Sequence, residues 1–89
     1  MKIPSKIKIS GQEYSVSQVR GMADSGNSDT SNNIILIKED MAQTEKESCL
    51  LHEIIEVINA NNDFNLNHQT IQTFENCLYQ VLKDNKLEF

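Results

Sequence analysis

Alternating apolar and polar positions in the first third of the chain predict extended structure. Ile7 and Ile9 precede the Ser-Gly-Gln segment at 10–12, and Tyr14 and Val16 follow it. Apolar residues that recur at every second position are typical of a half-buried β-strand. Two such runs joined by a short segment that contains glycine are typical of a β-hairpin. We therefore expect a hairpin near the start of the chain.

A third apolar run, at 34–37, is rich in β-branched residues and has no polar position, which favours a strand buried on both faces. The segment 20–33 before it consists largely of Gly, Ser, Asp and Asn and has almost no large apolar residue. That composition predicts a surface loop. The β-rich part of the chain, residues 1–37, is thus expected to form a three-stranded antiparallel sheet.

The rest of the chain has helical periodicity. Thr44 followed by Glu47 is a capping-box pattern, and the apolar residues from 50 to 58 fall on one arc, which predicts a helix over about 44–60. The Asn-rich segment 59–67 ends this helix. From Ile71 onwards, apolar residues recur at i, i+3, i+7, i+10 and i+11, which predicts a second helix over about 67–84. Residues 1–89 are therefore expected to form one α+β domain, with two packed helices following and covering the sheet.

Composition and charge exclude several classes of function. Eight Lys and Arg residues against thirteen Asp and Glu give a net charge of −5, so nucleic acid is not an expected partner, because its binding requires clustered basic residues. The longest apolar run has four residues, far below the roughly 18 that a membrane span requires. The first residues also lack the apolar core of a secretory signal. We expect a soluble, cytoplasmic domain that binds neither nucleic acid nor membrane.

The candidate chemistry lies in the first helix, where residues 50–56 read LLHEIIE. His52 and Glu56 are four positions apart, so their side chains lie one turn apart on the same helix face and are placed to hold one metal ion. The usual zinc peptidase motif is HExxH, and this chain has Glu56 in place of the second histidine. His68 supplies a second imidazole, and together the three residues make the two-histidine, one-carboxylate set of a catalytic zinc site. Glu53 then stands at the position of the general base.

Two residues of the second helix lie on the same edge of its apolar stripe as His68. Glu75 would either orient His68 by accepting a hydrogen bond or replace Glu56 as the carboxylate ligand. Tyr79 would donate a hydrogen bond to a developing oxyanion. The alternative for all these residues is an ordinary solvated helix face, on which a His–Glu pair at i,i+4 contributes only about 0.2–0.5 kcal/mol.

The helical half of the chain resembles a known family. The runs LLHEIIE at 50–56, LNH at 66–68 and LYQVLKDN at 78–85 are similar to those of small zincin-like proteins from phages and prophages. These proteins look like minimal relatives of the ImmA/IrrE type of metallopeptidase. The similarity covers residues 6–85 and is more specific in the helical half. It implies a zincin-like core, an origin on mobile DNA, and a place in the cytoplasm of a bacterial host cell.

By this resemblance, His52 matches the first zinc ligand and Glu53 the catalytic glutamate, while His68 compensates for the missing second histidine. The implied function is that of a zinc-binding metallopeptidase-like protein, in which Glu53 activates a zinc-bound water and a peptide or protein is the substrate. The strand at 34–37, if it lies at the sheet edge, would pair with an extended substrate. The alternative is a non-catalytic protein-binding module on the same scaffold, which the short chain and the altered motif favour.

Overall fold

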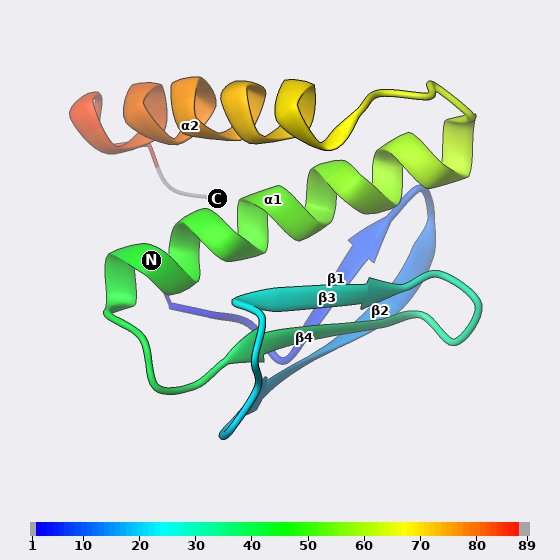
Figure 1. Ribbon diagram of the computed structural model, residues 1–89, viewed down its shortest axis with the longest axis horizontal. Coiled ribbons are helices and arrows are strands. Elements are labelled where there is room, and N and C mark those ends of the chain that lie inside the picture. The colour runs from blue at the N-terminus through cyan, green and yellow to red at the C-terminus, as the bar shows by residue number, and fades with distance from the viewer. Residues whose placement is uncertain (1, 88–89) are drawn as a thin grey trace.

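The first two strands form the hairpin that the alternating pattern predicts. In the computed structural model, which describes residues 2–87, β1 (Lys6–Ile9) pairs antiparallel with β2 (Gln12–Val19). Ser10 and Gly11 connect the strands with φ angles of 54° and 78°. Two successive positive φ angles are typical of the tight hairpin turn whose twist matches that of the strands, and glycine adopts them without steric cost. The hairpin prediction is confirmed (Figure 1).

The segment 20–33 is more than a loop, because it contains a fourth strand, β3 (Gly26–Asp29). The strand order is β1-β2-β4-β3, with β3 antiparallel to β4 (Ile34–Lys38) and β4 parallel to β2. The turn at 30–33 returns the chain along the inner side of β3, and the Asp29 side chain accepts two backbone hydrogen bonds within that turn. As a result β4 lies between β2 and β3. The prediction of a three-stranded antiparallel sheet is wrong: the sheet is four-stranded and mixed, and only the α+β class is confirmed.

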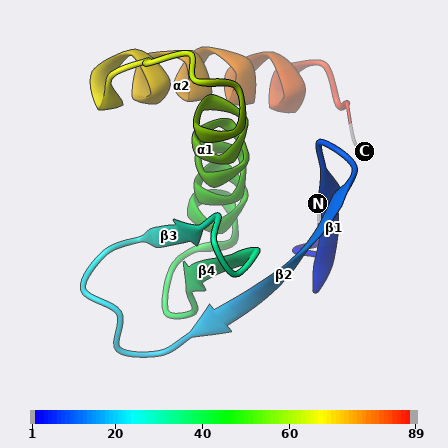
Figure 2. The same ribbon diagram turned by 90° about the vertical axis from the view of Figure 1, so that its right-hand side faces the viewer.

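The two helices form successive layers on one side of the sheet. α1 (Gln43–Asn62) packs against the sheet, and α2 (His68–Asp84) packs on the outer side of α1 and contacts no strand within the described residues (Figures 1 and 2). In β4, Ile35 and Ile37 are completely buried, whereas Ile34 and Leu36 are half-buried, because both described helices lie on the other side of the sheet. The main core cluster comprises Ile3, Ile9, Tyr14, Val16, Ile35, Ile37, Cys49, Leu50 and Val57.

The helix ends are set by backbone geometry and by one side-chain cap. α1 begins after Ala42 without a side-chain cap, so the capping box predicted from Thr44 and Glu47 does not form. α1 ends at Asn62, and the next residue, Asp63, has a left-handed φ of 52°. α2 is capped by the side chain of Asn67, which accepts a hydrogen bond from the Thr70 backbone N–H at 2.8 Å.

The apolar stripe predicted for the second helix is only partly buried. Ile71 is buried against α1, but Phe74 and Val81 are exposed, because α2 rests on one helix rather than on the sheet. Neither helix in residues 2–87 combines the length and the apolar character that crossing a membrane requires.

Candidate metal centre

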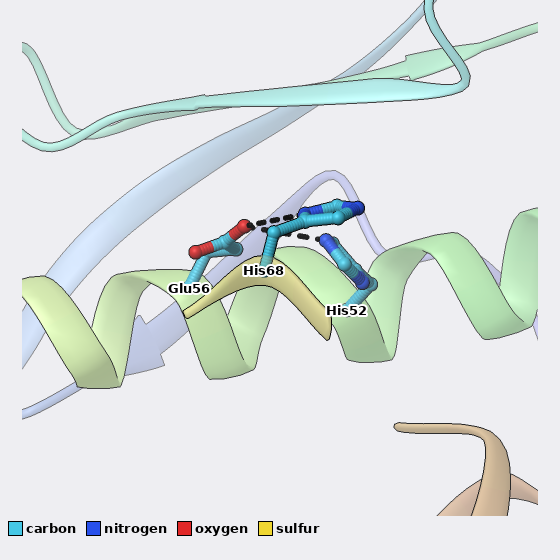
Figure 3. Close-up of side chains that lie close together, drawn as sticks. All are labelled: His52, Glu56 and His68. Carbon is cyan, nitrogen blue, oxygen red and sulfur yellow. Dashed lines mark ion pairs between the residues drawn. The ribbon is translucent and has the colours of Figure 1, made fainter. Parts of the chain in front are cut away.

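The structure brings His52, Glu56 and His68 together. His52 and Glu56 come from consecutive turns of α1, and His68 is the first residue of α2. The Glu56 Oε2 atom lies 3.3 Å from His52 Nε2 and 3.7 Å from His68 Nδ1. Figure 3 shows the Glu56 carboxylate pointing at both imidazole rings, whose centroids are 5.1 Å apart. The three residues each offer one donor atom, and these atoms all lie within 4.8 Å of one another.

These separations fit a single small cation. In a tetrahedral site with zinc–ligand bonds of about 2.0–2.1 Å, two ligand atoms lie about 3.3 Å apart. The Glu56–His52 distance already has this value, and the Glu56–His68 distance is 0.4 Å longer. Two imidazole nitrogens and one carboxylate oxygen are a donor set that zinc favours, and they leave a fourth position open. The residues therefore fit zinc in type, and the two separations from Glu56 lie close to the tetrahedral value, while all three donor atoms lie within 4.8 Å of one another.

The loop between the helices carries His68 to its place beside Glu56. Asn59, in the last turn of α1, accepts a hydrogen bond from the Leu66 backbone N–H at 2.9 Å and donates one to the Leu66 carbonyl at 3.4 Å. The Asn67 cap then starts α2. Because these contacts close a short connection of residues 63–67, the first residue of α2 returns beside the last turns of α1. The side chain of His68 is nevertheless 74% exposed, whereas His52 is buried.

Glu75 supports His52 rather than His68. The Glu75 side chain is buried, accepts hydrogen bonds from Ser48 Oγ and from Gln72 Nε2, and lies with Oε1 at 3.4 Å from His52 Nδ1. The buried Nδ1 atom makes no hydrogen bond within the described residues, so this carboxylate is its polar neighbour at contact distance. A carboxylate beside one imidazole nitrogen favours a proton there and leaves the other nitrogen free for a metal. In this structure the other nitrogen, Nε2, faces Glu56.

Glu53 lies on the sheet side of α1, against strand β3, and is only 6% exposed. Burial raises the pKa of its carboxyl group, while the charge of His52 and a hydrogen bond from Ser28 act in the opposite direction. β3 can approach this closely because residue 26 is glycine. A Cβ atom at Gly26 would lie 2.4 Å from Cys49 Sγ and 3.0 Å from Glu53 Oε2, so an alanine at this position would push β3 away from the helix.

A cavity of about 750 Å³ lies over these residues, between α1, the start of α2, and β3 with the segment before it. The strand that borders the cavity is therefore β3, at the edge of the sheet. Residues 34–37 form the inner strand β4, so the expectation that they offer a free edge to a substrate is wrong.

Cys49 also borders the cavity but is a poor metal ligand. Its buried thiol donates a hydrogen bond to the Ser25 carbonyl at 3.2 Å. Burial, together with the charges of Glu53 and Glu75, raises the thiol pKa to about 12. A metal binds the thiolate, which is scarce at such a pKa.

Tyr79 does not belong to the metal centre. Its hydroxyl donates a hydrogen bond to Glu47 Oε1 at 2.8 Å, and Lys83 Nζ lies 3.2 Å from the same oxygen. Tyr79 lines a second hollow near the chain ends and not the cavity over His52. The role predicted for Tyr79, as hydrogen-bond donor to an oxyanion, is therefore corrected: Tyr79 links α2 to a buried carboxylate of α1.

We expect the buried Glu47 carboxylate to make the stability of the fold depend on acid pH. Burial alone would raise the pKa of Glu47, but hydrogen bonds, including those from Tyr79 and Lys83, and the charge of Lys83 lower it from 4.5 to about 2. A carboxyl group with a lowered pKa stabilises the folded state above its unfolded pKa, and this contribution is lost as the pH falls through the folded pKa. Glu47→Gln should cost about 2 kcal/mol at neutral pH, the contribution of hydrogen bonds to a charged group.

The measurement is the free energy of unfolding of wild type and Glu47→Gln between about pH 6 and pH 2. The difference between the two proteins should shrink as the pH falls from about 4.5 towards 2. A difference that stays constant over this range would contradict the assignment.

Sequence reasoning missed the residues that surround the metal centre. Ser48 and Ser28 resemble any other surface serine in the sequence, and Gly26 lies in a segment with almost no large apolar residue. The contacts of these residues depend on long-range packing, because they form only where β3 and α2 lie against α1. Comparisons with protein-family models, with curated proteins and with solved structures find no match.

Proposed function

We propose that the protein binds one zinc ion through His52, Glu56 and His68 and acts as a metallopeptidase-like enzyme. One observation carries this proposal: donor atoms from two separate helices converge within 4.8 Å at the wall of a cavity. If His52 and Glu56 formed only a surface ion pair between neighbouring turns of α1, neither His68 from the second helix nor a cavity beside the pair would be expected. The resemblance of the helical half to zincin-like proteins supports the same function.

Each residue has a distinct task in this proposal. Zinc held by His52, Glu56 and His68 would supply Lewis-acid activation of a water molecule. Glu53 would accept a proton from the attacking water, and its raised pKa brings the group nearer to the neutral range in which a general base works well. Glu75 holds the ring of His52 in place.

The edge strand indicates the form of the substrate. β3 pairs with β4 on one side only, so its other edge presents backbone N–H and C=O groups towards the cavity side of the sheet. An extended peptide can add to such an edge as a further strand. We therefore propose an extended segment of a peptide or protein as the substrate, with β3 in the role first expected of residues 34–37.

A second candidate function, a non-catalytic protein-binding module, is favoured by the apolar surface. Phe64 is 57% exposed and Phe74 is 58% exposed, in the loop before α2 and on α2. Large exposed apolar side chains often belong to protein interfaces where they form a contiguous patch. In this alternative the metal is structural or absent.

Zinc binding tests the proposed enzyme against a binding module that holds no metal. Protein purified without a histidine tag or a chelator, or stripped and then dialysed against zinc, should contain about one zinc per chain by elemental analysis. Cobalt(II) in the same site should show the intense visible absorption of a four-coordinate ion. Wild-type protein that binds no zinc after reloading would contradict the proposed enzyme and favour the binding module.

A further inference from the structure

The charge of the cavity indicates which peptides it accepts. Among its described lining residues are five carboxylates and no lysine or arginine; the carboxylates are Asp24, Glu45, Glu53, Glu56 and Glu75. A concave site lined by one sign of charge concentrates ligands of the opposite sign, because the low-dielectric walls focus the field.

Asp24 and Glu45 differ from the other three carboxylates. Glu53, Glu56 and Glu75 contact the histidines or neighbouring hydroxyl groups. Asp24 and Glu45 are exposed, and within residues 2–87 neither side chain makes a hydrogen bond or an ion pair. Glu45 lies in the first turn of α1, where the helix dipole favours an acidic residue, but no such effect explains Asp24 in the segment before β3.

The position of Glu45 along α1 gives a distance from the metal centre. Glu45 precedes His52 by seven residues, which corresponds to about 10 Å along a helix axis. An extended peptide advances about 3.3 Å per residue, so about three residues span that distance. Asp24 also lines the cavity and lies two residues before β3, next to Ser25, whose carbonyl accepts the hydrogen bond from Cys49 one turn along α1 from Glu45.

We propose that the cavity selects extended peptides that carry a lysine or arginine about three residues from the bond at the metal centre. The basic side chain lies against Asp24 and Glu45, while the peptide backbone runs along β3. The inference rests on the proposed function for the location of the scissile bond. The charge preference itself requires only that a peptide binds in the cavity.

The test uses the full chain and short labelled peptides. Capped nine-residue peptides of Ala, Ser, Thr and Val carry fluorescein and either one lysine or one glutamate at each position in turn. Binding is measured by fluorescence anisotropy at about 50 mM and about 500 mM salt. At low salt, the best lysine peptide should bind about 5–20-fold more tightly than its glutamate counterpart, since each exposed charge pair is worth about 2–5-fold. The preference should fall at high salt, because salt screens exposed charges.

Matched variants distinguish the cavity from the overall acidity of the protein. Asp24→Asn combined with Glu45→Gln should remove the preference. Glu13→Gln combined with Asp84→Asn changes the net charge equally at exposed residues that do not line the cavity, and should keep the preference. Equal loss in both double variants, or no preference in wild type, would overturn the inference.

Zinc content and peptide cleavage, measured in parallel, test the proposed function separately. A lysine preference in a protein that binds no zinc would support the charge selection and reject the enzyme. Zinc binding and cleavage without a charge preference would reject the selection alone.

Discussion

Replacing His52 by alanine is expected to lower the zinc affinity of the protein by more than about 100-fold. Loss of a residue that merely supports a metal ligand typically lowers metal affinity by about 10–100-fold. His52 is proposed as a ligand itself, so its loss should lower the affinity further. It is also buried and held on both sides, with Nε2 at 3.3 Å from Glu56 and Nδ1 at 3.4 Å from Glu75. The pre-positioned ring should therefore contribute more than the exposed His68.

A graded series of variants measures these contributions. Competition with a chromophoric zinc chelator should give the largest loss of affinity for His52→Ala and a smaller loss for His68→Ala. The zinc affinity of Glu75→Gln should be about 10–100-fold lower than that of wild type, because the substitution removes the charge beside His52 but no ligand atom. Glu13→Gln, far from the site on β2, is the control and should bind like wild type. Unchanged affinity in His52→Ala would show that zinc, if bound, lies elsewhere.

The parts of the fold with a strong local pattern were predictable. The β1–β2 hairpin follows from alternation around a glycine, and both helices follow from periodic apolar residues. β3 was not predictable, because its residues Gly-Asn-Ser-Asp include no apolar side chain that marks a buried face. It is a strand because the turn at 30–33 directs its neighbour β4 back alongside it. The parallel pairing of β2 and β4 is a consequence of that long-range arrangement.

The candidate site shows the same division between local and long-range information. Helix geometry places His52 next to Glu56, and the structure has them in contact. A helical wheel also places Tyr79 on the same face as His68, but a wheel ignores distance along the axis. Their separation of eleven positions corresponds to about 16 Å along the helix axis. Because α2 runs back along α1, Tyr79 meets Glu47 instead of the metal centre.

The buried carboxylates were hidden from sequence reasoning for a related reason. On a helical wheel Glu53 falls on the side opposite the apolar residues from 50 to 58, which predicts a solvated position, yet it is buried against β3. Only the close approach of β3, which the glycine at position 26 permits, covers this face of the helix. A carboxylate at such a position suggests a function, since burial of a charge costs free energy that a surface glutamate would not lose.

Glu53→Gln is expected to reduce peptide cleavage by about 10²–10⁴-fold while leaving the zinc content unchanged. The amide has nearly the same shape as the carboxylate but cannot accept the proton of the attacking water, and general-base catalysis typically contributes a factor of this size. The assay uses whichever labelled peptide the wild-type protein cleaves, with zinc measured by elemental analysis in the same samples. Cleavage by the variant at the wild-type rate would exclude Glu53 as the base.

The same substitution should make the metal-free protein more stable. Glu53 is 6% exposed, and burial raises its pKa, so its charged form is disfavoured in the folded state at neutral pH. Glutamine can keep the hydrogen bond with Ser28 without carrying the buried charge. The melting temperature of metal-free Glu53→Gln should therefore exceed that of metal-free wild type, measured by circular dichroism at neutral pH. Lower stability would instead mean that Glu53 holds β3 against α1. Higher stability combined with lost cleavage is the pattern of a residue kept for its chemistry, because active sites commonly retain groups that destabilise the fold.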